Sequence, residues 1–299
     1  AREELFLWKI ESDLKFEKIN KPFISCFAVL PPTSANPDLR IMDFDVINVT
    51  ADEKSIGFVM VTVYSDSAIR LWYFNYESKK FTLISEGEYK TCCILNTNFI
   101  VVDRSIYILI SATDGHLTLW NIDSTLKNDF KLSKNSKSLV LNNKDTADVV
   151  ISEFSSMKLL INQQIHQSGI KDMALRFIDP IEDEIAKIDV ITGGDDNALG
   201  ITSFIFNKQT SEVNCEISSF VPDAASSTIT SVSLTTNSQA VIVTSVDQVL
   251  KKWSINDSNL ELLEEKYTTI ADTGCSSVTE IDGSEVALVG GSGFSIWKL

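Results

Sequence analysis

The sequence has little of what disordered, fibrous or membrane-spanning chains require. Six prolines and twelve glycines in 299 residues are too few for a collagen-like or unstructured chain. No run of roughly 18 uncharged apolar residues is present, so a transmembrane helix is not expected. Residues 1–10 carry charges and lack the apolar core of a signal peptide. We therefore expect a globular, cytoplasmic protein.

Positive charge is also scarce. Lysine and arginine number 26 against 41 aspartates and glutamates, which gives a formal net charge of −15. Such a field repels phosphate backbones at long range, so a role with nucleic acid requires a basic partner or a local basic patch. We take the lysines of one polar stretch as candidate RNA contacts and note further basic residues elsewhere. They are Lys127, Lys131, Lys134 and Lys137 in the stretch, and Arg70, Arg104, Lys251 and Lys252 outside it.

Metal-binding and catalytic signatures are missing as well. No glycine-rich phosphate loop, H-E-x-x-H pair or EF-hand loop is present. The two histidines, His116 and His166, come with no nucleophile and orienting group of a hydrolase. The cysteines form no C-x-x-C pair, and their odd number is typical of buried, reduced thiols. We expect no catalytic residue, no cofactor and no metal site. The five cysteines are Cys26, Cys92, Cys93, Cys215 and Cys275.

One pattern recurs along the chain, an aspartate six residues before a tryptophan with apolar residues between them. A copy that begins at Asp196 has Thr202 in place of tryptophan, and the copy that ends at Trp297 has Gly291 in place of aspartate. The segment that ends at Trp8 matches the end of a further copy. The full copies are Asp66–Trp72, Asp114–Trp120 and Asp247–Trp253.

Each full copy follows an apolar run that is typical of a strand buried on both faces. The aspartate suits a tight turn because it bonds nearby backbone amides, and the tryptophan fills space between packed sheets. Repeats of roughly 40–45 residues with these features predict an all-β WD-repeat β-propeller of about six to seven blades. Within this fold we expect His166 to pair with Asp196 of its own blade.

We expect residues 1–299 to form a single propeller domain. The interval from Trp120 to Thr202 is too long for one repeat of about 40–45 residues. Residues 123–165, rich in Lys, Asn, Ser and Asp, are therefore expected to form a long loop or a degenerate blade. The segments ending at Trp8 and Trp297 both match third strands, which cannot share a blade. We expect the chain to be the C-terminal part of a longer one whose upstream residues complete the ring.

An ordered series of segments over roughly residues 105–299 is more specific than the repeat itself. It resembles the last propeller of the family of large WD-repeat proteins that partner the tRNA 2′-O-ribose methyltransferase acting at the anticodon wobble position. The segments that carry the resemblance are Ala112–Gly115 with Leu119–Trp120, His166–Ile170, Gly193–Leu199, Ile229–Val232, Ser245–Gln248 with Trp253, and Ala287–Gly293.

The resemblance implies a non-catalytic scaffold subunit that places tRNA for a partner methyltransferase. It carries no tRNA-contact residue over to this chain, because the matched positions are residues that maintain the fold. A generic WD-repeat adaptor in trafficking, ubiquitin ligation or chromatin assembly is the alternative. An enzyme built on a propeller is a third hypothesis.

Overall fold

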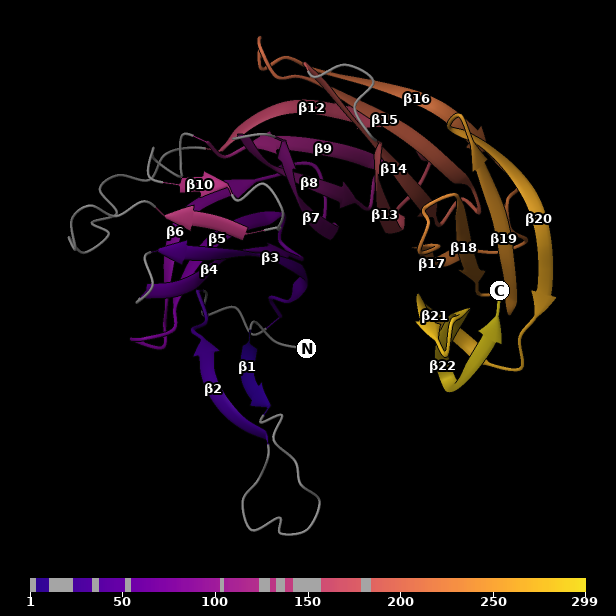
Figure 1. Cartoon of the computed structure of the whole chain (residues 1–299), viewed down its shortest axis with the longest axis horizontal. Helices are drawn as coiled ribbons and strands as arrows, with labels where there is room; N and C mark the ends of the chain where they lie inside the picture. Colours follow the sequence, from indigo (N-terminus) through magenta and orange to yellow (C-terminus); the bar gives the residue numbers. More distant parts are fainter. Residues whose placement is uncertain are drawn as a thin grey trace. The chain divides into compact units, whose positions relative to one another are not determined.

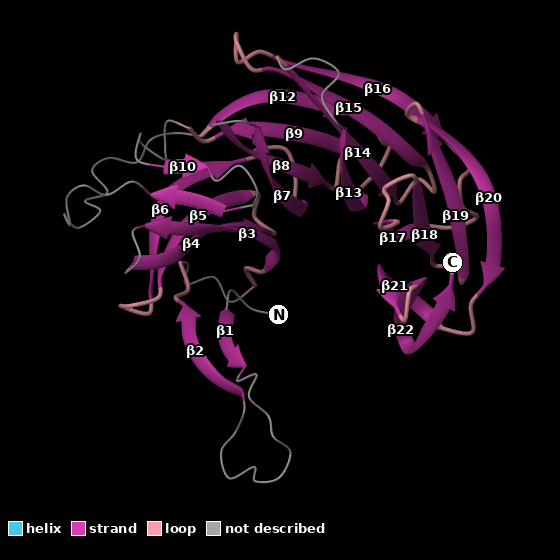
Figure 2. Cartoon of the chain, viewed as in Figure 1, coloured by secondary structure: helices cyan, strands magenta, loops and turns pink. Residues whose placement is uncertain are grey.

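A computed structural model describes residues 4–10, 24–33, 38–51, 55–102, 105–123, 130–132, 138–141, 157–178 and 184–299. These residues form strands and turns, so the described part of the chain has no helix that could cross a membrane (Figure 2). The prediction of an all-β WD-repeat propeller chain is confirmed. The chain divides into two compact units, Ala1–Ile108 with Asn121–Lys158, and Leu109–Trp120 with Leu159–Leu299.

The first unit contains a four-stranded blade in which β3, β4, β5 and β6 are successive antiparallel neighbours (Figure 1). A two-stranded antiparallel sheet, β1-β2, packs Leu5, Leu7 and Leu30 against Met60 and Phe74 of this blade. The strands are β1 (Leu5–Ile10), β2 (Ile24–Leu30), β3 (Ile41–Ala51), β4 (Ser55–Tyr64), β5 (Ala68–Asn75) and β6 (Lys80–Glu88).

The segment expected to be a long loop or degenerate blade contributes strands to two sheets. β11 (Ser138–Leu141) pairs parallel with the end of β3, and β10 (Phe130–Leu132) pairs antiparallel with β11. β12 (Lys158–Gln164) is the outer strand of a sheet with the order β12-β9-β8-β7. Residues 124–129, 133–137 and 142–156 lie outside the described residues. The other strands of this sheet are β7 (Ile94–Val102), β8 (Ser105–Ala112) and β9 (His116–Asn121).

The second unit contains two further four-stranded antiparallel blades, β13 to β16 and β17 to β20, and the pair β21-β22. The N–H of Leu299 donates to the carbonyl of Glu285 at 3.0 Å, so the end of β22 returns alongside its beginning. The strands are β13 (Ile170–Ile178), β14 (Ile185–Gly194), β15 (Leu199–Asn207), β16 (Val213–Val221), β17 (Ile229–Leu234), β18 (Ala240–Ser245), β19 (Val249–Asn256), β20 (Asn259–Tyr267), β21 (Ala271–Ile281) and β22 (Ser284–Lys298).

Burial falls from the second strand of a blade to the fourth. Every residue of β18 is buried, and so is β14 from Ile188 to Gly194, because neighbouring blades cover both faces of these apolar strands. The outer strand β20 is exposed along most of its length. The apolar runs of the sequence therefore mark the strands that the neighbouring blades sandwich.

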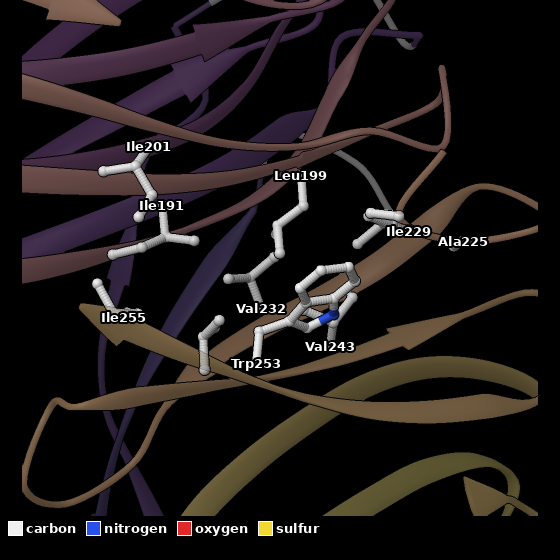
Figure 3. Packing of buried hydrophobic residues seen from close by; sticks show 11 residues of the cluster. Ile191, Leu199, Ile201, Ala225, Ile229, Val232, Val243, Trp253 and Ile255 are labelled. Atoms are coloured by element: carbon white, nitrogen blue, oxygen red, sulfur yellow. The ribbon is translucent and has the colours of Figure 1, made fainter. Parts of the chain in front are cut away.

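The core between the blades β13–β16 and β17–β20 is centred on Trp253, whose exposed fraction is 6%. Side chains of β14 and β15 meet the indole and its neighbours from β17, β18 and β19 (Figure 3). The shared apolar surface joins the two blades. The cluster includes Ile191, Leu199, Ile201, Ile229, Val232, Val243, Trp253 and Ile255.

Replacing Trp253 by alanine is expected to destabilise the second unit, because it removes the indole that fills this core. Burial of this kind is worth about 3–5 kcal/mol, which should appear as a lower denaturation midpoint by circular dichroism. The matched control is Trp8→Ala, since Trp8 is 54% exposed and surface substitutions usually stay within about 0.5 kcal/mol. Equal shifts for the two variants would contradict this assignment.

Candidate functional site

The turns between second and third strands are built alike around an aspartate. In each, the carboxylate Oδ1 accepts a hydrogen bond from the backbone N–H two residues later, at 3.1–3.2 Å. The residue between them has φ between 64° and 79°, a left-handed conformation that closes a tight turn. These aspartates occupy the four positions that the repeat pattern singles out, Asp66, Asp114, Asp196 and Asp247.

Four of the five repeat tryptophans pack against apolar neighbours. Trp72 and Trp120 are 3% and 7% exposed, and each indole N–H donates to a threonine hydroxyl at 2.9 Å. Trp253 is buried, and half-buried Trp297 packs against the cluster of the last blades and donates to a serine hydroxyl at 2.7 Å.

The expectation of core packing is wrong for Trp8, which is 54% exposed. Leu5 and Leu7 occupy the side of β1 that packs on the blade β3–β6. Successive side chains of a strand point to opposite faces, so Trp8 projects from the other side.

All five cysteines lie among the described residues and carry free thiols. The expectation that they are buried is wrong, because Cys26 and Cys275 are exposed and the others are half-buried. Burial, with a smaller effect from the charge of Glu216, raises the pKa of the Cys215 thiol to about 11. This thiol therefore stays protonated near neutral pH and is a poor nucleophile.

His166 joins two loops of the blade β13–β16. Its side chain is fully buried, with Nδ1 2.8 Å from Asp196 Oδ1 and Nε2 2.9 Å from Thr192 Oγ1. A carboxylate only accepts, so in the neutral ring Nδ1 carries the proton and Nε2 accepts from the Thr192 hydroxyl. The predicted pair with Asp196 is confirmed. Both ring nitrogens are occupied, so His166 holds structure together rather than offering a proton acceptor to a substrate.

Glycines make room for this arrangement. A Cβ on Gly194 would lie 2.6 Å from both His166 Nδ1 and Asp196 Oδ1, so only glycine fits there. Gly115, with φ of 79°, is the αL residue of the turn between β8 and β9. Its carbonyl accepts the N–H groups of Ile165 and His166 at 2.9 and 3.1 Å. The His166 loop is therefore held by turns of two blades.

The carboxylate of Asp196 is ionised at neutral pH. Burial raises its pKa, but hydrogen bonds from His166 and from the N–H of Gln167 and of Ala198, together with electrostatic attraction from His166, bring it below the ordinary 3.8. The Gln167 N–H donates to Oδ2 at 2.8 Å. The side chain thus holds its own turn and the His166 loop at once.

Carboxylates also join the innermost strands of neighbouring blades, a feature that the sequence analysis missed. In the first unit, Asp43 and Asp45 of β3 accept the backbone N–H groups of Thr97 and Phe99 of β7 at 2.9 and 2.8 Å. The available signal was the presence of aspartates at alternate positions of a strand that is mostly apolar.

The same device recurs in the second unit. Asp172 Oδ2 of β13 accepts the N–H of Val232 at 2.8 Å and the hydroxyl of Ser231 at 2.9 Å, both from β17. The Ser231 hydroxyl in turn accepts the N–H of Ser276 of β21 at 3.0 Å. Burial raises the pKa of Asp172, and hydrogen bonds from Val232, Ser231 and Met173 only partly offset it. The links run through three successive blades.

The structure does not describe the side chains of the candidate RNA-contact lysines. Lys127, Lys134 and Lys137 lie outside the described residues, as does Arg104, and for Lys131 only the backbone, in β10, is described. Their role therefore stays a prediction. Within the described residues, no group of three or more His, Cys, Asp or Glu side chains is arranged to hold a metal ion.

Arg70 and Lys251, two other candidate contacts, are engaged inside the blades. Arg70 Nε lies 2.9 Å from Glu86 Oε1, and its guanidinium carbon is 4.3 Å from the centre of the Tyr64 ring. Lys251 Nζ donates to the carbonyl of Ala224 at 2.8 Å, and its side chain is 14% exposed. Neither side chain is presented to a ligand.

Comparison with known proteins supports a WD-repeat chain. No family model matches the sequence. The chain is similar to the tRNA (34-2'-O)-methyltransferase regulator WDR6 of Bos taurus, with 24% identity over 99 residues. The matched stretch is 31% of this chain and 9% of the bovine protein, so it spans a small part of that relative.

Replacing Asp196 by alanine is expected to lower the free energy of unfolding by about 1.5–3 kcal/mol at pH 7, because the buried His166 N–H loses its charged acceptor. The pKa of Asp196 is below 3.8 in the folded chain, so its contribution is present above that pH and is lost as the pH falls through the folded pKa. Urea unfolding at several pH values should show the two proteins converging below pH 3.8.

The matched control is Asp195→Ala. Asp195 is the neighbouring carboxylate and pairs with the partly exposed Lys171 at 3.3 Å, so the change should stay within about 0.5 kcal/mol. If Asp196→Ala unfolds at the same urea concentration as the wild type at pH 7, the His166 network contributes nothing to the free energy of unfolding.

Proposed function

We propose that this chain is a non-catalytic WD-repeat scaffold that supports 2′-O-ribose methylation at the wobble position of the tRNA anticodon, placing tRNA for a partner methyltransferase in the cytoplasm. The observation that carries the proposal is the similarity of a propeller chain to a tRNA (34-2'-O)-methyltransferase regulator. The order of the segments quoted above, which follow one another to the end of the chain, agrees with it.

A scaffold contributes to such a reaction through positioning. A methyltransferase must hold a ribose hydroxyl about 3–3.5 Å from the methyl donor, and misplacement near 1 Å can cost about 100-fold in rate. Blades present their loops from a packed sheet framework, and binding residues are commonly found on such loops. The hydrogen bonds of His166 and Asp172 hold loops and neighbouring strands in place in the second unit.

Features of individual side chains favour a supporting role over a catalytic one. Both ring nitrogens of His166 are hydrogen-bonded within the fold, and the Cys215 thiol has a pKa of about 11. The bovine relative is named as a regulator of a methyltransferase. A chain that regulates and positions needs no catalytic group of its own.

The net charge of −15 favours the second candidate function, a generic protein–protein adaptor. Under the proposed scaffold role, the same charge implies that much of the chain contacts the partner enzyme, with RNA touching a limited area. The two functions differ in their dependence on tRNA.

Removing the whole protein from its source cells is expected to abolish 2′-O-methylation at tRNA nucleotide 34, the position in the name of the bovine relative. The reason is the loss of positioning, estimated above at about 100-fold. The measurement is mass spectrometry of nucleosides from purified tRNA, with the other tRNA modifications as internal controls.

Restoring the protein should restore the modification, and Trp8→Ala should restore it equally well, since Trp8 lies outside the blade cores. Wobble methylation that persists without the protein would reject the proposed function, and the adaptor function would replace it.

A further inference from the structure

The chain contains two pairs of adjacent lysines, Lys79-Lys80 and Lys251-Lys252. The two pairs differ in their surroundings. Lys251 donates to a backbone carbonyl, and Lys252 lies opposite Glu264 in the register of β19 and β20. Lys79 and Lys80 are both exposed, at the turn between β5 and β6. In a chain of net charge −15, this turn presents two adjacent cations to solvent.

The turn that carries Lys79 is held by Asn75. Its side-chain Oδ1 accepts the N–H groups of Glu77 and Ser78, both at 2.9 Å, and its backbone carbonyl accepts the N–H of Lys79 at 2.9 Å. Lys79 has φ of 56°, which completes the tight turn. The two lysines therefore leave the blade from a fixed backbone. Glu77 of the same turn is an exposed acidic residue and offsets part of the positive charge.

Aromatic rings lie beside these lysines. Lys79 Nζ is 4.8 Å from the centre of the Phe27 ring, and the Phe27 and Tyr76 rings are 6.3 Å apart. Phe74 and Phe58 meet Tyr76 edge-on at 5.2 and 5.8 Å. Tyr76 is still 39% exposed, so its ring is anchored in the blade and presents part of its surface to solvent.

We propose that this basic–aromatic patch, formed by Phe27, Tyr76, Lys79 and Lys80, binds unpaired RNA. A base stacks on Tyr76 while the lysine ammonium groups contact the flanking phosphates. Rings that accept any base face, together with cations that follow the backbone, are the combination that binds single-stranded nucleic acid. The inference rests on the proposed function and gives the tRNA a contact site on this chain.

The patch can be tested with the full chain and an anticodon stem-loop RNA in a fluorescence anisotropy titration over a range of salt. Lys79→Glu with Lys80→Glu should weaken binding roughly tenfold or more, because two attractions become repulsions. The slope of log affinity against log salt should fall by about 1.4, since each lost single-strand phosphate contact removes about 0.7.

Tyr76→Ala should weaken binding at least about fivefold through lost stacking, whereas Tyr76→Phe keeps the ring and should bind nearly as the wild type does. Lys158→Glu with Lys171→Glu is the matched control, because it changes the net charge equally at exposed lysines of other strands. Circular dichroism on each variant verifies that the fold is retained.

Three results would contradict the proposal that the patch binds RNA: no RNA binding by the wild type, wild-type RNA affinity in the Lys79/Lys80 variant, or an equal loss of RNA affinity in the Lys158/Lys171 control. The proposed function stands or falls separately. Wobble methylation that needs the protein but tolerates the Lys79/Lys80 variant rejects the patch alone. RNA binding at the patch without any effect of the protein on wobble methylation rejects the proposed function alone.

Discussion

The register between neighbouring blades depends on side chains of one innermost strand that bind backbone N–H groups of the next. Apolar packing joins the blades but is non-directional, so it does not by itself prevent sliding. The bonds from Val232 N–H to Asp172 and from Ser276 N–H to Ser231 are directional, and they link the first strands of three successive blades of the second unit, β13, β17 and β21. Asp43 and Asp45 do the same between β3 and β7 in the first. The loops that a scaffold presents depend on this register.

Asp172 of the inner-strand links and Asp196 of the turns have pKa values that shift in opposite directions. Burial raises the pKa of Asp172, so the stability it contributes is fully present below 3.8 and declines as the pH rises through its folded pKa. Asp196, with a lowered pKa, contributes above 3.8 and loses its contribution in acid. The Asp172 link therefore tolerates mild acid better than the His166–Asp196 pair does.

The sequence predicted what local chemistry determines. The aspartate-to-tryptophan spacing located the tight turns and the buried strands, because hydrogen bonds within three residues and continuous apolar runs require no knowledge of distant neighbours. The orientation of Trp8 was mispredicted, since it depends on which side of β1 meets the blade. The bond between Asp172 and Val232 joins residues far apart in sequence, and spacing alone does not predict such a contact. The two lysine pairs look alike in sequence, but the Ala224 carbonyl engages Lys251, whereas Lys79 and Lys80 lie exposed at a turn.

The carboxylate of Asp172 holds β17 against β13. Native-state hydrogen exchange at the backbone amide of Val232 tests this most directly, because that N–H donates to the carboxylate. The wild-type amide should be strongly protected. In Asp172→Ala it should exchange much faster, while the amide of Phe99, which is bound to Asp45 in the first unit, stays protected. Unchanged protection at Val232 in that variant would contradict the account.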